Sequence, residues 1–82
     1  MARKSVLVTG GMGFVGANVA LKFIEEDYEA ILYDITQHEI DFLEEKKGRW
    51  RFVRGDVDDW RKVLETVEEY EVEGIVHGAL PI

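Results

Sequence analysis

The stretch Thr9-Gly10-Gly11-Met12-Gly13-Phe14-Val15-Gly16 decides which fold the rest of the chain can adopt. Two glycine spacings overlap in it, G-x-G-x-x-G from Gly11 and G-x-x-G-x-x-G from Gly10. In such a loop the first glycine permits a tight turn out of a strand. The middle one lets backbone approach a pyrophosphate, and the last lets the next helix pack closely. The pattern therefore predicts a strand–turn–helix unit whose helix N-terminus binds phosphate groups. The alternative is a tight turn that binds nothing.

The residues around this loop carry patterns of alternating strands and helices. We expect strands at Ser5–Thr9, Ala30–Tyr33, Trp50–Arg54 and Ile75–Leu80. We expect helices at Phe14–Glu26, at Glu39–Lys47 before Gly48, and from Trp60 onward.

The last helix has the clearest pattern. Asp58 or Asp59 is expected to be its N-cap, because a carboxylate can accept from the free N–H groups of the first turn. An apolar stripe follows, made of Trp60, Val63, Leu64, Val67 and Tyr70. We expect this stripe, with Trp60 in it, to face the core rather than a ligand.

Strands that alternate with helices predict a parallel sheet with right-handed crossovers. We expect an α/β fold, the first half of a doubly wound Rossmann fold, with four strands in the order 3-2-1-4. Residues 1–82 would form one truncated cofactor-binding half-domain. The first two helices would cover one face of the sheet, and only the Trp60 helix the other. The fourth strand would be an apolar edge without charge. Such edges invite pairing, so we expect a homodimer or other self-association through it.

Asp34 follows Gly16 by eighteen residues, at the end of the second expected strand. A dinucleotide-binding domain places there the carboxylate that accepts hydrogen bonds from the adenosine ribose. The next residues, Ile35 to His38, include no arginine that could neutralise a 2′-phosphate. The sequence therefore favours NAD over NADP. The alternative is an aspartate that only ends a strand in a turn.

Composition limits the remaining possibilities. The chain has 82 residues, which allow one small domain, and a formal net charge of −7, which disfavours nucleic acid and anionic membranes as partners. It has no cysteine, so disulfides and thiolate metal sites are excluded, and a reducing, cytoplasmic location is expected. His38 and His77 are too far apart in sequence to suggest a metal site. We expect His77 to be packed or hydrogen-bonded to backbone.

Four segments in the right order resemble the extended short-chain dehydrogenases/reductases, the NAD-dependent epimerase/dehydratase family. They are the glycine loop, Leu32-Tyr33-Asp34, Arg54-Gly55-Asp56-Val57 and Val76-His77-Gly78-Ala79. The resemblance implies that Asp56 hydrogen-bonds the adenine amino group, that Val57 contacts the adenine, and that Gly78 and Ala79 lie against the cofactor. The alternative for Asp56 is a Gly-Asp turn before the helix cap. The candidate cofactor-binding residues are Gly10, Gly11, Met12, Gly13, Phe14, Val15, Gly16, Asp34, Ile35, Asp56, Val57, Gly78 and Ala79.

The chain departs from the family pattern in two respects. Family members are closer to His-x-Ala-Ala after the fourth strand, and they continue into a catalytic Tyr-x-x-x-Lys pair. None of Tyr28, Tyr33 and Tyr70 has a lysine four residues later, so hydride chemistry lacks its proton partner. We expect no catalytic residue here, and an N-terminal fragment that binds the ADP part of NAD(H). The alternatives are half of an enzyme completed by a partner chain, or a non-catalytic interaction module.

Overall fold

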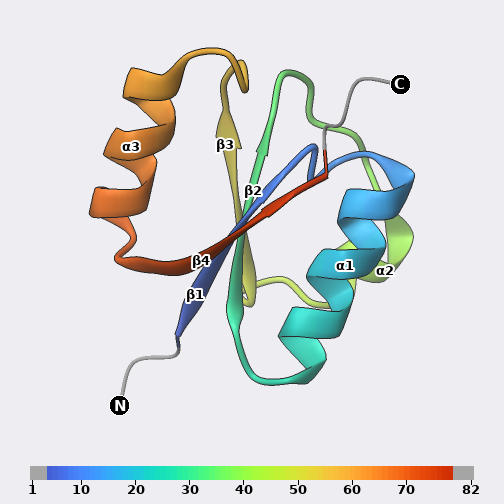
Figure 1. The fold of residues 1–82 in the computed structure, drawn as a ribbon. Helices are drawn as coiled ribbons and strands as arrows, with labels where there is room; N and C mark the ends of the chain where they lie inside the picture. Colours follow the sequence, from blue (N-terminus) through green and yellow to red (C-terminus); the bar gives the residue numbers. More distant parts are fainter. Residues whose placement is uncertain (1–3, 79–82) are drawn as a thin grey trace.

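The computed structural model describes residues 4–78 and confirms the predicted fold class. The elements are β1 (Ser5–Thr9), α1 (Phe14–Glu25), β2 (Glu29–Asp34), α2 (Asp41–Glu44), β3 (Trp50–Arg54), α3 (Trp60–Glu69) and β4 (Val72–His77). The strands pair in parallel in the order β3-β2-β1-β4. Figure 1 shows α1 and α2 on one side of the sheet and α3 on the other. No helix of the described residues is long and apolar enough to cross a membrane.

The two faces of the sheet bury two separate apolar clusters, because successive side chains of a strand point to opposite faces. The cluster on the α1 side includes Val6, Val8, Ala17, Ala20, Ile24, Ala30 and Leu32. The cluster on the α3 side is smaller and contains Leu7, Ile31, Tyr33 and Val63. The central strands β1 and β2 are therefore buried on both faces, which is why they read as nearly continuous apolar runs.

The helix expected at Glu39–Lys47 is wrong in extent, since α2 has one turn of four residues. Leu43 is its single buried side chain, so there is no apolar stripe to hold a longer helix against the sheet. The indole of Trp50 also donates to the carbonyl of Leu43 at 2.7 Å. A chain of turns follows and reaches Gly48, whose φ of +90° is in the left-handed region.

The fourth strand was expected at Ile75–Leu80, but β4 begins and ends three residues earlier. Its extent follows from its pairing with β1, in which Ser5 pairs with Val72 and Thr9 with His77. Leu80 lies outside the described residues. The expectation of an edge without charge is also wrong, because this register places the exposed carboxylate of Glu73 in the strand.

The apolar stripe of α3 divides between the core and the surface. Val63 is buried, and Val67 and Tyr70 pack against the cluster on the α3 side, whereas Trp60 is 66% exposed and Leu64 57% exposed. The prediction that Trp60 faces the core is therefore wrong. Thr66 is buried instead, because its hydroxyl donates to the carbonyl of Lys62 at 2.8 Å and needs no water.

The structure also decides between the two candidate caps of α3, because the amide of Lys62 donates to the carboxylate of Asp59 at 3.2 Å. We expect Asp59→Ala to lower the free energy of unfolding by about 1 kcal/mol. Asp58→Ala is the matched control, since the side chain of Asp58 does not cap the helix. Urea denaturation of both variants checks this, and equal losses in the two would contradict the assignment.

Candidate functional site

The glycine loop leaves β1 through a tight turn. Gly10 has a φ of +66°, which favours glycine, and its amide donates to the carbonyl of Tyr33 at 2.8 Å. The amide of Gly13 then donates back to the carbonyl of Gly10 at 3.0 Å. The loop is thereby fixed on the ends of both central strands before α1 begins.

Two further glycines are required by packing. A Cβ on Gly16 would overlap the carbonyl of Gly10 and lie 3.0 Å from the Cα of Gly11. A Cβ on Gly11 would lie 2.9 Å from the carbonyl oxygen of Val8. Gly16 therefore lets the first turn of α1 rest directly on the loop, as the sequence predicted.

Gly13 differs from its neighbours, because the fold does not need a glycine there. Its backbone is extended, with φ −79° and ψ 169°, and it is exposed. Among residues 4–78, a Cβ at this position would meet only the carbonyl oxygen of Gly10, at an ordinary 3.4 Å. A glycine at this position is explained if a group from outside the chain, such as a ligand, approaches the backbone there.

The N-terminus of α1 offers free hydrogen-bond donors. Gly13 is its N-cap and has no side chain that could accept from the first turn, which contains no acidic residue. The first intrahelical bond is donated by Ala17, at 2.8 Å from the carbonyl of Gly13. The preceding amides therefore point out of the helix, where they and the helix dipole favour an anion. The side chains of Phe14 and Val15 are also exposed at this end.

Asp34 lies beside the loop, as predicted, and its carboxylate is held by two backbone amides. Met12 donates to one oxygen at 3.0 Å and Ile35 to the other at 2.7 Å. Each oxygen keeps a further lone pair for a ligand hydroxyl. Met12 can take part only through its backbone, because its side chain is 3% exposed and packs in the core.

The turn after β3 comes to the same end of the sheet, because parallel strands all end at one edge. The amide of Gly55 donates to the carbonyl of Asp34 at 3.0 Å. Asp56 is exposed, and one of its carboxylate oxygens accepts from the amide of Asp58 at 2.8 Å. The turn that the sequence left open as an alternative is therefore present, and it leaves the second carboxylate oxygen for a ligand. Val57 is half-buried next to it.

The roles of two residues in this region were not predicted from the sequence. Tyr33 is fully buried, and its hydroxyl donates to the carbonyl of Asp56 at 2.8 Å. Burial raises the pKa of Tyr33, and the nearby carboxylates of Asp59 and Asp56 raise it further. Arg54 donates to the carbonyl of Ile35 at 3.4 Å, so a guanidinium does lie near Asp34. Register could have indicated it, since Arg54 pairs with Asp34 across β2 and β3.

The end of β4 closes the site on its other side. The hydroxyl of Thr9 and Nδ1 of His77 are 2.7 Å apart, so His77 is hydrogen-bonded, though to a side chain and not to backbone. Gly78 donates to the carbonyl of Thr9 at 2.9 Å, and a Cβ on it would lie 3.5 Å from the Cα of Gly16. Gly78 therefore lies against the glycine loop, while Ala79 is outside the described residues.

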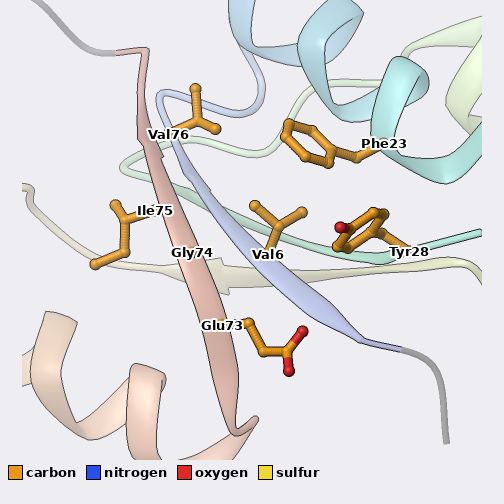
Figure 2. Close-up of a pocket in the computed structure, with 7 residues that line it drawn as sticks. All are labelled: Val6, Phe23, Tyr28, Glu73, Gly74, Ile75 and Val76. Carbon is orange, nitrogen blue, oxygen red and sulfur yellow. The ribbon is translucent and has the colours of Figure 1, made fainter. Parts of the chain in front are cut away.

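A separate groove of about 420 Å³ lies along β1 and β4, away from the loop residues of this site. It is lined by Val6, Phe23, Tyr28, Glu73, Gly74, Ile75 and Val76. Figure 2 shows Phe23 and Tyr28 on one side of β4 and the side chain of Ile75 on the other. The groove therefore lies over β1 and β4 on the α1 side of the sheet, and none of its lining residues belongs to the glycine loop.

The chain matches the NAD dependent epimerase/dehydratase family over residues 6–81. It is 30% identical over 80 residues to the UDP-glucose 4-epimerase of Neisseria gonorrhoeae, covering 92% of this chain and 24% of that protein. It is 33% identical over 78 residues to a putative UDP-glucose 4-epimerase of Methanocaldococcus jannaschii, covering 94% and 24%. The chain thus spans about a quarter of the length of these relatives.

Solved structures agree with the sequence relatives. The dTDP-glucose 4,6-dehydratase of Bacillus anthracis, in complex with NAD, superposes with a TM-score of 0.79 and 25% identity, over 95% of this chain and 27% of that one. The UDP-glucose 4-epimerase of Brucella ovis, also with NAD, gives a TM-score of 0.77 and 31% identity over 95% and 23%. The fold, the glycine loop and these matches together show that the chain belongs to the NAD dependent epimerase/dehydratase family.

Proposed function

We propose that the chain binds the ADP part of NAD(H) at the carboxyl end of its sheet. The pyrophosphate would lie on the N-terminus of α1, the adenosine ribose at Asp34, and the adenine at Asp56 and Val57. The observation that carries the proposal is Gly13, where the fold leaves room for a side chain and the chain has none. The NAD complexes of the Bacillus anthracis and Brucella ovis relatives support the same cofactor.

The preference for NAD over NADP rests on how firmly Asp34 is held. Its two hydrogen bonds to backbone amides keep the carboxylate in place, so it cannot move aside for a 2′-phosphate. Arg54 is the cation nearest in the register, and it is directed to the carbonyl of Ile35. The fixed negative charge therefore favours a ribose with free hydroxyls.

Binding, and not turnover, is the function that we propose for these 82 residues. The relatives include enzymes named for epimerisation of UDP-glucose, but the sequence has no Tyr-x-x-x-Lys that could supply the proton transfer. Chemistry on a nucleotide sugar would need groups supplied from outside these residues. We also propose that the protein works in the cytoplasm, since it has no cysteine.

We further propose that two copies associate through β4. Within residues 4–78 this strand pairs only with β1, so its outer edge presents unpaired backbone groups. Apolar side chains are exposed on its α3 side, with Ile75 at 53% and Trp60 and Leu64 on the neighbouring helix. The groove described above lies on its α1 side, and Figure 2 shows the side chains that line it. A second copy paired along this edge would cover both surfaces. The repulsion between the Glu73 carboxylates of the two copies would oppose this pairing.

The first test concerns Gly13. Gly13→Val should abolish NAD binding and leave the chain folded, because its side chain would occupy the space of the pyrophosphate. Gly74→Val, in β4, is the matched control, since a Cβ at Gly74 would meet no atom of the described residues within 4 Å. Calorimetric titration with NAD and urea denaturation check both variants. Undiminished binding by folded Gly13→Val would show that the loop is not the phosphate site.

The second test concerns the choice of cofactor. Wild-type protein should bind NAD more tightly than NADP, and Asp34→Ala should weaken NAD binding at least about tenfold, because a hydrogen bond to a charged group contributes roughly 1.5–3 kcal/mol. The same variant should narrow the preference against NADP, since the negative charge that repels a 2′-phosphate is then removed. Asp41→Ala, an exposed aspartate of α2, is the control. Equal affinities of wild-type protein for the two cofactors would contradict the assignment.

The third test concerns association. Light scattering over a concentration series should give a mass that rises above the 9.4 kDa of one chain. The rise should be stronger at high salt, which screens the Glu73 pair. Ile75→Lys should abolish it by placing a charge on the edge, whereas Ile35→Lys, at an apolar residue also exposed but at the cofactor site, should not. A constant mass of one chain under all conditions would rule the dimer out.

A further inference from the structure

We infer that the hydroxyl of Tyr33 is the positioning group for adenine recognition: it fixes the turn at Gly55–Val57 and, through it, the carboxylate of Asp56. This inference rests on the proposed binding of the ADP part of NAD. The side chain of Tyr33 is buried on the α3 side of β2, so no cofactor atom would touch the group to which this role is assigned.

The hydroxyl reaches the turn from inside the protein. Tyr33 is the second-last residue of β2, and its ring packs with Leu7, Ile31 and Val63 on the α3 side of the sheet. At the end of this ring the hydroxyl donates to the carbonyl of Asp56 at 2.8 Å. A buried hydroxyl needs such a partner, because an unpaired one is costly. The strand and the turn are therefore joined by a side chain that water does not reach.

The turn is shaped to admit this side chain. A Cβ on Gly55 would overlap the hydroxyl of Tyr33 and lie 2.8 Å from its ring carbon Cε2. Gly55 is not among the glycines of positive φ, so its backbone conformation does not demand glycine. The packing of Tyr33 is thus the reason for glycine directly before Asp56.

The hydrogen bond fixes more than one atom of Asp56. The same carbonyl accepts from the amide of Asp59 at 3.0 Å, and one carboxylate oxygen accepts from the amide of Asp58 at 2.8 Å. Backbone and side chain of Asp56 are therefore held together, and the remaining carboxylate oxygen has a defined direction. Tyr33 also adjoins Asp34 in the chain. The end of one strand would then set the separation between the ribose-binding and adenine-binding carboxylates.

A packing role for the ring and a positioning role for the hydroxyl make different predictions. Loss of stability alone would weaken all dinucleotides by the same factor. Loss of position at Asp56 would weaken only the ligand whose base offers an amino group. Nicotinamide hypoxanthine dinucleotide has a carbonyl oxygen in place of that amino group, so it presents an acceptor where adenine presents a donor. The ratio of the two affinities therefore reports on Asp56.

The experiment measures the dissociation constants of NAD and nicotinamide hypoxanthine dinucleotide by NMR titration of the full chain. Wild-type protein should prefer NAD about tenfold or more, as expected for a hydrogen bond to a carboxylate. Tyr33→Phe, which keeps the ring, should lower this ratio about threefold or more. In an Asp56→Ala background the same substitution should leave the ratio unchanged, because the two residues act through one contact. Tyr70→Phe, at the residue that follows α3 and packs against the same face of the sheet, should behave as wild type.

Several outcomes would overturn the inference. An unchanged ratio in folded Tyr33→Phe would reduce the hydroxyl to a packing detail, and failure of this variant to fold would make its role structural. A wild-type ratio near one would show that Asp56 does not recognise the amino group. Absence of NAD binding by wild-type protein would instead refute the proposed function itself, so the two failures are distinguishable.

Discussion

The structure depends on the close approach of the first turn of α1 to the carbonyl of Gly10. Because Gly16 has no Cβ, the helix begins directly on the turn that leaves β1. The small residues Ala17 and Ala20, both buried, continue the contact down the sheet. Gly78 places the end of β4 beside the same turn, since a Cβ on Gly78 would lie 3.5 Å from the Cα of Gly16. The close packing at Gly16 therefore places the N-terminus of α1 beside the ends of β1 and β4.

This placement explains how an acidic chain can hold an anion. With a net charge of −7 the protein has little general attraction for phosphate, so attraction must be local. Backbone amides and the dipole of α1 supply it without a lysine or arginine in the loop. The carboxylates of Asp34 and Asp56 lie beyond this terminus, at the ends of β2 and β3, where hydroxyl and amino donors are the groups that fit them. The carboxyl edge of the sheet therefore has a helix terminus that favours anions at the end of β1, and two carboxylates at the ends of β2 and β3.

Local patterns predicted those parts of the molecule that local interactions determine. The bounds of β1 and β3 agree with the predicted ones, and the positions of Gly16 and Asp34 relative to the loop are as expected. The predicted start of β4 was wrong because an edge strand takes its extent from the strand it pairs with, here β1. Trp60 was misplaced because periodicity shows that a helix has an apolar side but not which part of it meets the sheet. The bond from Tyr33 to Asp56, 23 residues apart, leaves no periodic trace in the sequence.

The glycines of this chain separate two kinds of constraint that sequence alone cannot distinguish. At Gly11, Gly16, Gly55 and Gly78 an added Cβ would come within 3.0 Å of another atom of the chain, so folding is sufficient to explain them. At Gly13 the backbone is extended and the nearest atom lies at 3.4 Å, so folding explains nothing. Gly13 stands at the N-cap of α1, where a ligand phosphate would approach the backbone. The fold could also accept a side chain at Gly74, in β4, but of these two glycines only Gly13 lies at the helix terminus that a cofactor phosphate would approach.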